Sequence, residues 1–265
     1  MDVELESALD ALTAAGRIAG WEHHRALAST NDHALERIPA LAAEDLPHLV
    51  ISDAQTAGRG RGANRWWSAP GALLFTLIVD PEAWRIDQRL WPRLSVAVGG
   101  AVVEAVAALG AGSAAQLKWP NDVYIGGRKV CGILVEGGAG TTARVAIGVG
   151  VNVTNSFEDA PEEVRARAAS LSDCGMGAVD RAGTLVAILD HLARDLELLT
   201  DEPAGLVDRW RGRCFLTGRM ISVESAGQIR IGACLGLEDD ASLLLQTDVG
   251  LERCYAGVVT VLDAA

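Results

Sequence analysis

A short segment in which arginine alternates with glycine has the clearest chemical potential in the sequence. Residues 58–62 read Gly-Arg-Gly-Arg-Gly, and Arg65 follows three residues later. Glycine lets backbone N–H groups approach an anion closely, and guanidinium groups pair with phosphate or carboxylate through two hydrogen bonds. No Gly-Lys-Ser/Thr follows and no helix begins there, so neither a Walker A loop nor a dinucleotide-binding fingerprint fits. We expect a loop that orders over an anionic ligand; a solvated surface loop is the alternative.

A turn and a strand supply further polar groups. Pro120 ends a short strand after Lys-Trp and presents Asn121 and Asp122 at the tip of a turn. An aspartate beside an asparagine suits Mg²⁺ or a ribose, but the same pair is common in ordinary turns. Lys129 begins an otherwise apolar strand, where a lysine must face water or an anion. Gly132 leaves space for a group to pack on that strand.

Paired glycines mark another predicted strand. Gly148 and Gly150 alternate with apolar residues before the strand closes on the polar Asn152. Missing side chains at alternate positions clear one face of a strand, which suits the close approach of a flat ligand. A bulged strand end is the alternative.

Hydrolytic and zinc-centred catalysis find little support. The histidines (His23, His24, His33, His48 and His191) show no metal-binding spacing such as HExxH, and there is no GxSxG elbow. The 5 cysteines are an odd number without a CxxC pair, which indicates inert thiols in a reducing compartment. Cationic side chains, glycines and a candidate Mg²⁺ turn suit transfer at phosphorus, where positioning and charge neutralisation do most of the catalysis.

Composition narrows the class of protein. The chain has 265 residues, 49% of them hydrophobic and 22% charged, and its net charge is −12, which argues against nucleic-acid binding as its main role. The most apolar segment, 94–112, contains Glu104 and two glycines, so we expect a core helix rather than a membrane span. The early acidic residues do not fit a signal peptide, and a cytoplasmic location is expected.

The elements that must position these groups alternate between helices and strands. We predict helices over 3–15, 91–109, 161–170, 181–200 and 203–211, and a helix that starts at Ser29-Thr30-Asn31, where hydroxyls are placed to cap it. Strands are predicted over 48–52, 72–79, 116–119, 123–125, 129–136 and 143–151, with a glycine turn at 126–127 and another at 137–140.

The pattern changes near residue 215. Short apolar runs then recur at roughly ten-residue spacing (219–223, 228–236, 242–246, 251–255 and 258–262), which is typical of a small all-β barrel. We therefore expect two domains, 1–215 and 216–265.

Taken in this order, the motifs resemble those of the biotin protein ligase family. The matching segments lie between about residue 27 and residue 153: Ser29-Thr30-Asn31, Gln55 to Arg61, Trp66-Trp67-Ser68, Lys118 to Asp122, Arg128-Lys129, Gly132 to Glu136 and Gly148 to Val153. The C-terminal strand pattern fits the family's SH3-like barrel. A single motif of this kind would be weak, but the ordered set is specific.

The resemblance implies a fold and a reaction. The fold is α+β, with a mixed sheet flanked by helices as in class II aminoacyl-tRNA synthetases, followed by the barrel. Biotin's carboxylate attacks the α-phosphorus of ATP, giving biotinyl-5′-AMP and pyrophosphate. A lysine of a biotin carboxyl carrier domain of a carboxylase then takes the biotinyl group and releases AMP. ATP and biotin are the implied substrates, Mg²⁺ is implied with them, and a homodimer is one assembly that the family allows.

The resemblance also implies residue roles. Arg59 and Arg61 would close over the adenylate, and Lys129 would neutralise charge on the biotin carboxyl group and the α-phosphate. With Asp122, also the candidate Mg²⁺ ligand, these three are the candidate catalytic residues. The candidate biotin-binding residues are Ser29, Thr30, Asn31, Gln55, Arg59, Gly60, Arg61, Lys129, Gly132 and Leu134. The candidate adenylate-binding residues are Trp66, Asn121 and Asn152.

Three departures and two alternatives accompany this reading. Gly62-Ala63 stands where the family usually has Arg-Gly, Leu73 stands where it commonly has asparagine, and Val258 follows Gly257 where it usually has glutamate. The matching region begins too early for the N-terminal winged-helix domain of some members, so no repressor role is expected. A lipoate or octanoyl ligase shares the core fold, and a weakly catalytic protein that binds biotin or biotinyl-AMP is a second alternative.

Overall fold

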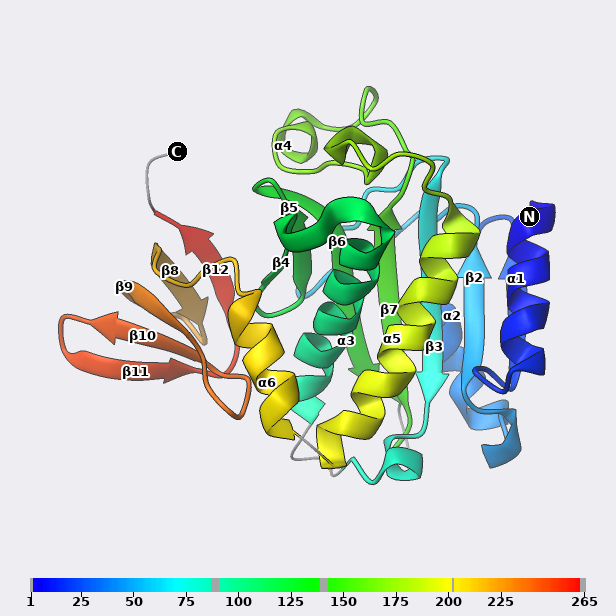
Figure 1. Ribbon diagram of the computed structural model, residues 1–265, viewed down its shortest axis with the longest axis horizontal. Coiled ribbons are helices and arrows are strands. Elements are labelled where there is room, and N and C mark those ends of the chain that lie inside the picture. Colours follow the sequence, from blue (N-terminus) through cyan, green and yellow to red (C-terminus); the bar gives the residue numbers. More distant parts are fainter. Residues whose placement is uncertain (1, 87–90, 139–142, 202, 263–265) are drawn as a thin grey trace.

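A seven-stranded mixed sheet forms the centre of the molecule (Figure 1). The computed structural model describes residues 2–86, 91–138, 143–201 and 203–262. The strand order is β1-β2-β3-β7-β6-β5-β4, with β1 parallel to β2 and every other neighbouring pair antiparallel. The strands are β1 Gly20–His24, β2 His48–Ser52, β3 Ala72–Val79, β4 Ala115–Lys118, β5 Asp122–Ile125, β6 Arg128–Gly137 and β7 Val145–Asn152.

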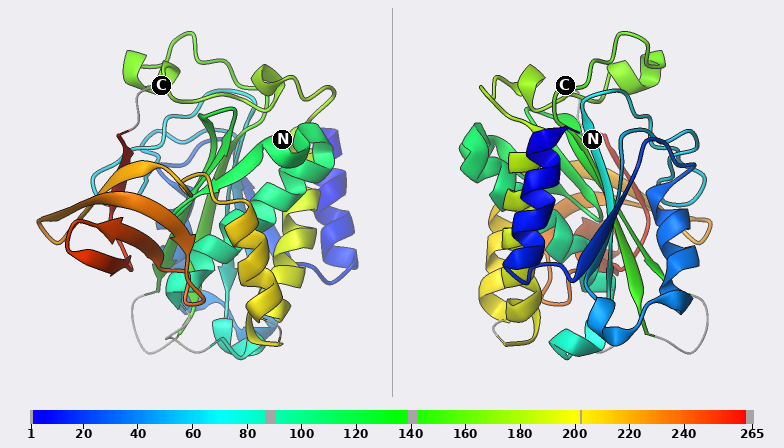
Figure 2. Two further views of the ribbon diagram at one scale, coloured as in Figure 1. Left: turned by 60° about the vertical axis from the view of Figure 1, so that its left-hand side comes forward. Right: turned by 90° about the vertical axis from the view of Figure 1, so that its right-hand side faces the viewer.

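Helices cover both faces of this sheet unequally (Figure 2). One face carries α1 Val3–Ala14, α3 Trp91–Val106, α5 Arg181–Asp201 and α6 Pro203–Gly212. The opposite face carries α2 Thr30–Arg37, and the short α4 Glu162–Arg165 lies at one end of the sheet. Leu5, Leu9 and Leu12 of α1 are buried, as the helical spacing predicts. Ser29 caps α2, because its side chain accepts a hydrogen bond from the Asp32 backbone N–H.

Helix α3 is a core helix. Among the described residues, the segment Arg93–Ala111 is long and apolar enough to cross a membrane, with a mean hydropathy of 1.9. Its side chains from Val96 to Val98 and from Ala101 to Val103 are buried, and it packs on the sheet and on α5. The expectation of a core helix is confirmed, and a turn of π-helix at Ala107–Ala111 continues it.

The C-terminal strands form a second, antiparallel sheet in the order β11-β10-β9-β8-β12. They are β8 Met220–Ser225, β9 Gln228–Leu237, β10 Leu243–Thr247, β11 Gly250–Cys254 and β12 Val258–Val261. All five predicted runs are strands, whereas closure of a barrel through β11 and β12 stays a prediction. The connection into this sheet runs along β4: the Leu117 N–H donates to Arg213 O, and the Phe215 N–H to Leu117 O, both at 2.8 Å. The predicted boundary near 215 therefore falls on a segment that still borders the first sheet.

Two elements differ from the sequence prediction. The helix expected over 161–170 is wrong beyond Arg165, because the chain there turns to pair with β6: the Lys129 N–H donates to Arg167 O, and the Ala169 N–H to Lys129 O. Strand β1 was not predicted, since its polar, half-buried sequence gives no apolar run. The predicted turn over 137–140 lies partly outside the described residues. All five cysteines are free thiols.

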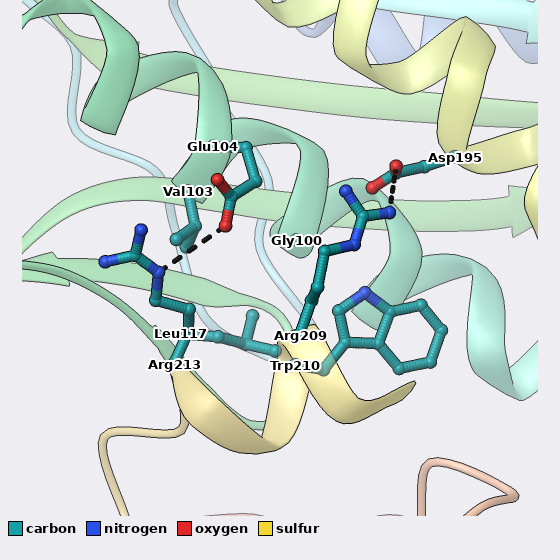
Figure 3. A pocket seen from close by; sticks show the side chains of 8 residues that line it. All are labelled: Gly100, Val103, Glu104, Leu117, Asp195, Arg209, Trp210 and Arg213. Atoms are coloured by element: carbon teal, nitrogen blue, oxygen red, sulfur yellow. Dashed lines mark hydrogen bonds and ion pairs between the residues drawn. The ribbon is translucent and has the colours of Figure 1, made fainter. Parts of the chain in front are cut away.

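A buried ion pair ties α5 to α6 (Figure 3). Arg209 Nη2 lies 2.7 Å from Oδ1 of Asp195, whose side chain is only 2% exposed. Beside it, Arg213 Nε lies 3.4 Å from Glu104 Oε1 on α3. The cavity between these side chains measures about 10 Å³, the size of a single water molecule, so the contact is a structural one. Burial raises the pKa of Asp195, and Arg209 counteracts part of that effect.

We expect Arg209→Met to lower the free energy of unfolding by about 2 kcal/mol at neutral pH, because it leaves the Asp195 carboxylate buried without its partner. The loss should shrink as the pH falls through the raised pKa of Asp195, since the protonated acid carries no charge to desolvate. Urea titrations at several pH values measure both effects. The control is Arg17→Met, which breaks an exposed pair with Asp190 and should cost under about 1 kcal/mol. Equal losses at all pH values would contradict the assignment.

Candidate functional site

A wide cleft of about 1210 Å³ opens over the face of β6 and β7 that carries the glycines. Its walls are the Arg/Gly loop, the turn after β4, the segment around α4 and the edge of the second sheet. Every residue that the sequence singled out lines it: Ser29, Thr30, Asn31, Gln55, Arg59, Gly60, Arg61, Trp66, Asn121, Asp122, Lys129, Gly132, Leu134 and Asn152. The structure thus brings the predicted residues together; the role of each stays a prediction.

The floor of the cleft consists of glycines. Gly132 of β6 and Gly150 of β7 are register partners on neighbouring strands. The Trp66 ring lies over both: a Cβ at Gly132 would lie 2.9 Å from it, and one at Gly150 would lie 2.7 Å from it. Any larger residue would displace the indole. Gly132 and Gly150 therefore clear space for the Trp66 ring, whereas Gly148, the other glycine of the pair in β7, clears space for the Asn31 side chain.

A buried polar network supports one wall. The Asn31 amide donates to Glu136 Oε2 at 2.8 Å and to Leu134 O at 3.3 Å, and Thr76 Oγ1 lies 2.9 Å from its Oδ1. Asn31 is 3% exposed, so these contacts engage both ends of its amide within the protein. Thr76 was not predicted from the sequence because it lies in the middle of an apolar strand.

Gln55 joins the loop to the start of α2. Its Oε1 accepts hydrogen bonds from the Thr30 backbone N–H at 2.8 Å and from Thr30 Oγ1 at 3.2 Å. Thr30 Oγ1 in turn lies 2.9 Å from Thr76 Oγ1. Since these bonds occupy the carbonyl oxygen of Gln55, its amide NH₂ is the end left to meet a ligand.

Two lysines stand on one side of the cleft, and they are the only lysines of the sequence. Lys129 Nζ lies 2.6 Å from Asp122 Oδ1 and 5.6 Å from the centroid of the Trp66 ring. Lys118 Nζ lies 3.2 Å from Tyr124 Oη, and burial lowers the pKa of Lys118. Lys118 is part of the turn motif but was not chosen as a site residue. The position of Lys118 beside a turn in the sequence does not show that its side chain reaches the same cleft.

Two of the three loop arginines, Arg59 and Arg61, have different partners. Arg59 reaches across the cleft wall to two carboxylates: it contacts Asp32 of α2, and its Nη2 lies 2.6 Å from Glu136 Oε1 of β6. Hydrogen bonding to Glu136 raises the pKa of Arg59. In this conformation Arg59 therefore anchors the loop to the core. Neither acid was predicted as a site residue, because nothing in their local sequence distinguishes them from surface acids.

Arg61 points toward the second sheet instead. Its Nη1 donates to Gly257 O at 3.3 Å, and burial lowers the pKa of its guanidinium. Gly257 and Val258 both line the cleft, as do Glu224 and Ser225 from β8. The second sheet thus forms part of the cleft wall even though Val258 replaces the residue that the resemblance implied.

The remaining predicted residues, Asn121 and Asn152, form hydrogen bonds within the protein beside the cleft. Asn121 donates from Nδ2 to Ile133 O at 2.7 Å and accepts at its own backbone oxygen from the Ile133 N–H, so it fixes the turn onto β6. Asn152 is 2% exposed, and its Oδ1 accepts from Asn155 at 3.2 Å. Arg167, missed at the sequence level, also lines the cleft after the chain leaves α4.

Comparison with known proteins gives one consistent result. The model of the "Biotin/lipoate A/B protein ligase family" matches residues 24–152. A biotin--[acetyl-CoA-carboxylase] ligase of Mycobacterium tuberculosis is 37% identical over 249 residues, which are 91% of this chain and 88% of that protein. The bifunctional ligase/repressor BirA of Bacillus spizizenii is 34% identical over 214 residues, 78% of this chain but only 64% of that protein.

A solved structure agrees in fold. The biotin protein ligase from Aquifex aeolicus in complex with biotin and ATP superposes with a TM-score of 0.78, covering 92% of this chain and 99% of that chain. Its sequence is 23% identical, so this likeness concerns the fold alone.

We expect Gly148→Ala to lower the free energy of unfolding by about 1–3 kcal/mol. The new Cβ would overlap Oδ1 of Asn31, whose buried side chain is held in place by hydrogen bonds to Thr76, Leu134 and Glu136. Chemical denaturation measures the change. Gly177→Ala is the matched control, because a Cβ there has nothing within 4 Å and should shift stability by less than about 0.5 kcal/mol. Equal stability of the two variants would show that the cleft wall tolerates the overlap.

Proposed function

The chain belongs to the biotin/lipoate A/B protein ligase family, and we propose that its cleft activates biotin with ATP and transfers it to a carrier protein. A biotin carboxylate oxygen forms a bond to the α-phosphorus of ATP, and pyrophosphate leaves. The amine of a carrier lysine then attacks the acyl carbon of biotinyl-5′-AMP, AMP leaves, and the amine loses a proton. The observation that carries this proposal is the convergence of all predicted residues on one glycine-floored cleft.

Positively charged side chains of the cleft support the first step, the formation of the adenylate. Negative charge gathers where the carboxylate meets the α-phosphate, and fixed positive groups there stabilise the transition state more than the ground state. Lys129 is held by Asp122 beside the glycine floor, so its position is set before the ligand arrives. Arg61 is half-buried at the opposite wall, where its poorly solvated charge favours an anionic partner. We assign Lys129 to the reacting oxygens and Arg61 to the adenylate phosphate.

The biotin end has a polar and an apolar requirement. We assign the polar ring atoms of biotin to the NH₂ of Gln55, with Ser29 and Thr30 beside it. The hydroxyls of Ser29 and Thr30 already form hydrogen bonds within the protein, so these residues support this end of the cleft. Gly132 and Leu134 line the strand beneath it. Asn31 supports the cleft wall from within the protein, because its amide is already hydrogen-bonded to other residues. We assign Trp66 to stacking on the adenine and Asn121 and Asn152 to the adenylate side of the cleft.

The loop 58–65 serves as the cover. Its backbone is folded back on itself, with the Gly60 N–H donating to Asn64 O and the Trp66 N–H to Gly58 O, both within 2.9 Å. Arg59 anchors it on Asp32 and Glu136, whereas Arg61 connects it to the second sheet. Ligand binding would tighten this cover and exclude water from the mixed anhydride.

Mg²⁺ fits the site only as an ion that is already bound to the phosphates of a nucleotide. Mg²⁺ takes one or two carboxylates together with substrate phosphate oxygens. Asp122 supplies a carboxylate, but Lys129 already lies 2.6 Å from one of its oxygens. We therefore propose that Asp122 would hold a nucleotide-bound Mg²⁺ through its other oxygen, where the ion would neutralise the triphosphate.

Partners and location follow from the same proposal. The macromolecular partner is the biotin carboxyl carrier domain of a carboxylase, and a cytoplasmic location is proposed with it. The net charge of −12 supports the absence of a nucleic-acid partner. A homodimer stays a prediction from the family resemblance.

Isotope exchange between ATP and pyrophosphate that depends on biotin tests the activity, and transfer of label to a carrier domain tests the second step. Exchange with lipoate or octanoate in place of biotin would select the lipoate-type alternative. Binding of biotin without exchange would select a binding protein. Absence of both exchange and binding would reject the proposal.

We expect Lys129→Ala to raise the barrier to adenylate formation by about 2–4 kcal/mol, a loss of roughly 30- to 900-fold in exchange rate, because one charge-stabilising donor is removed. The exchange assay at saturating biotin and ATP measures it. Arg17→Ala, in an exposed pair far from the cleft, is the control and should exchange at the unaltered rate. A rate for Lys129→Ala near that control would reject the role of Lys129.

Arg61→Ala should still form the adenylate but release it. The expected result is a higher rate of biotinyl-5′-AMP escape, measured as biotin label on an added lysine-rich bystander protein. Self-labelling is a poor readout here, because both lysines of this chain lie in the cleft. Arg17→Ala is again the control. Unchanged bystander labelling would contradict a covering role for Arg61.

A further inference from the structure

Three histidines and a glutamate meet at the free edge of the seven-stranded sheet, outside the cleft. We call Glu22, His24, His33 and His48 the edge cluster. Glu22 and His24 alternate along the edge strand β1, His48 begins β2, and His33 comes from α2. Glu22 is the hub: His33 Nε2 lies 3.3 Å and His48 Nε2 3.7 Å from its Oε1, and His24 Nε2 lies 3.5 Å from its Oε2.

These contacts, at 3.3–3.7 Å, are longer than well-formed hydrogen bonds. Donor and acceptor in an N–H···O bond are normally 2.7–3.2 Å apart. Glu22 Oε1 and the Nε2 atoms of all three histidines are nonetheless closed off from solvent, and none has a hydrogen-bond partner among the residues that the structure describes. Buried polar atoms without partners are rare, and a missing ion is one recognised explanation. Here several of them converge on a single carboxylate.

The donor atoms lie close enough together to converge on one metal ion. Zinc binds imidazole nitrogen and carboxylate oxygen at 2.0–2.2 Å in tetrahedral geometry, which places neighbouring donor atoms about 3.3 Å apart. One donor atom each from Glu22, His24 and His33 lie within 4.8 Å of one another, and His48 approaches the same carboxylate. The four side chains thus provide four imidazole-nitrogen and carboxylate-oxygen donors, which are ligand types that zinc binds.

Arg37 is the group that a metal ion would replace. Its Nε lies 3.4 Å from Glu22 Oε1, so its positive charge lies next to the oxygen that an ion would bind. The Arg37 side chain is 40% exposed and stands on the last residue of α2, so much of it already faces water although its Nε is closed off from solvent. The contact therefore competes with a metal ion without blocking it permanently.

We propose that the edge cluster binds one divalent transition-metal ion of the zinc class. The ion would join three elements, since its ligands come from β1, β2 and α2. The other side of α2 faces the cleft, where Thr30 and Asn31 line the wall. A bound ion would therefore fix the helix that carries part of the cleft. The site itself does not depend on the proposed ligase activity.

Equilibrium dialysis of the full chain against Zn²⁺, after chelator treatment, tests the site. We expect one Zn²⁺ per chain, and a Co²⁺-loaded sample should show the visible absorption of a tetrahedral site. His33→Gln should weaken Zn²⁺ binding by more than the roughly tenfold typical of losing an outer partner of a ligating histidine. His23→Gln is the matched control: His23 neighbours His24 but pairs with Asp53 at 2.9 Å, and its loss should leave the affinity unchanged.

Arg37→Met separates a metal site from a purely structural cluster. Removing the competing guanidinium should tighten Zn²⁺ binding severalfold, and it should also increase the rise in thermal midpoint caused by Zn²⁺. Both effects should disappear in the double variant with His33→Gln. Failure of the unaltered chain and of Arg37→Met to bind Zn²⁺ would overturn the proposal. Binding that survives His33→Gln at full affinity would overturn it as well, because the ion would then sit elsewhere, for instance on cysteines.

Discussion

The cleft depends on the absence of side chains at three positions of the central sheet. Gly132, Gly148 and Gly150 leave one face of β6 and β7 bare, and the Trp66 ring and the Asn31 amide occupy the space that Cβ atoms would take. The other face of the same strands is packed by α3 and α5 with apolar side chains. The sheet is therefore packed against the apolar core on one face and carries the Trp66 ring and the Asn31 amide close to its backbone on the other. A ligand that enters the cleft meets these two side chains, so its binding does not require the apolar core to reorganise.

Acidic side chains hold cationic side chains of the cleft in place, so these cations need not be brought together when a ligand binds. Lys129 is held by Asp122, Arg59 by Asp32 and Glu136, and each acid belongs to a different element of the fold. In a chain with a net charge of −12, such pairing keeps the cations in place and limits their mutual repulsion. Arg61 is the exception, because its partner is a neutral carbonyl. That difference leaves the charge of Arg61 more available to an anionic ligand than the charge of Arg59.

The sequence predicted the parts of this site whose signal is local. Glycine alternation, a proline-ended turn and a lysine in an apolar strand each have a physical meaning within a few residues, and all of them line the cleft. The ordered motifs then identified the family, which the comparisons confirm. What could not be predicted depends on contacts between distant segments. Thr76 and Glu136 look like ordinary strand residues until Asn31 lies against them, and the end of α4 is set by pairing with β6.

The edge cluster shows the same limit more sharply. His24, His33 and His48 are separated by 9 and 15 residues, so no metal-binding motif is visible along the chain. The parallel pairing of β1 with β2 and the packing of α2 across them are what bring these rings around Glu22. Helix α2 therefore contributes to both places: its first turn forms part of the cleft wall, and His33 in its middle belongs to the edge cluster. An ion bound at the edge cluster would restrain the part of α2 that lines the cleft, because no flexible segment separates His33 from Thr30.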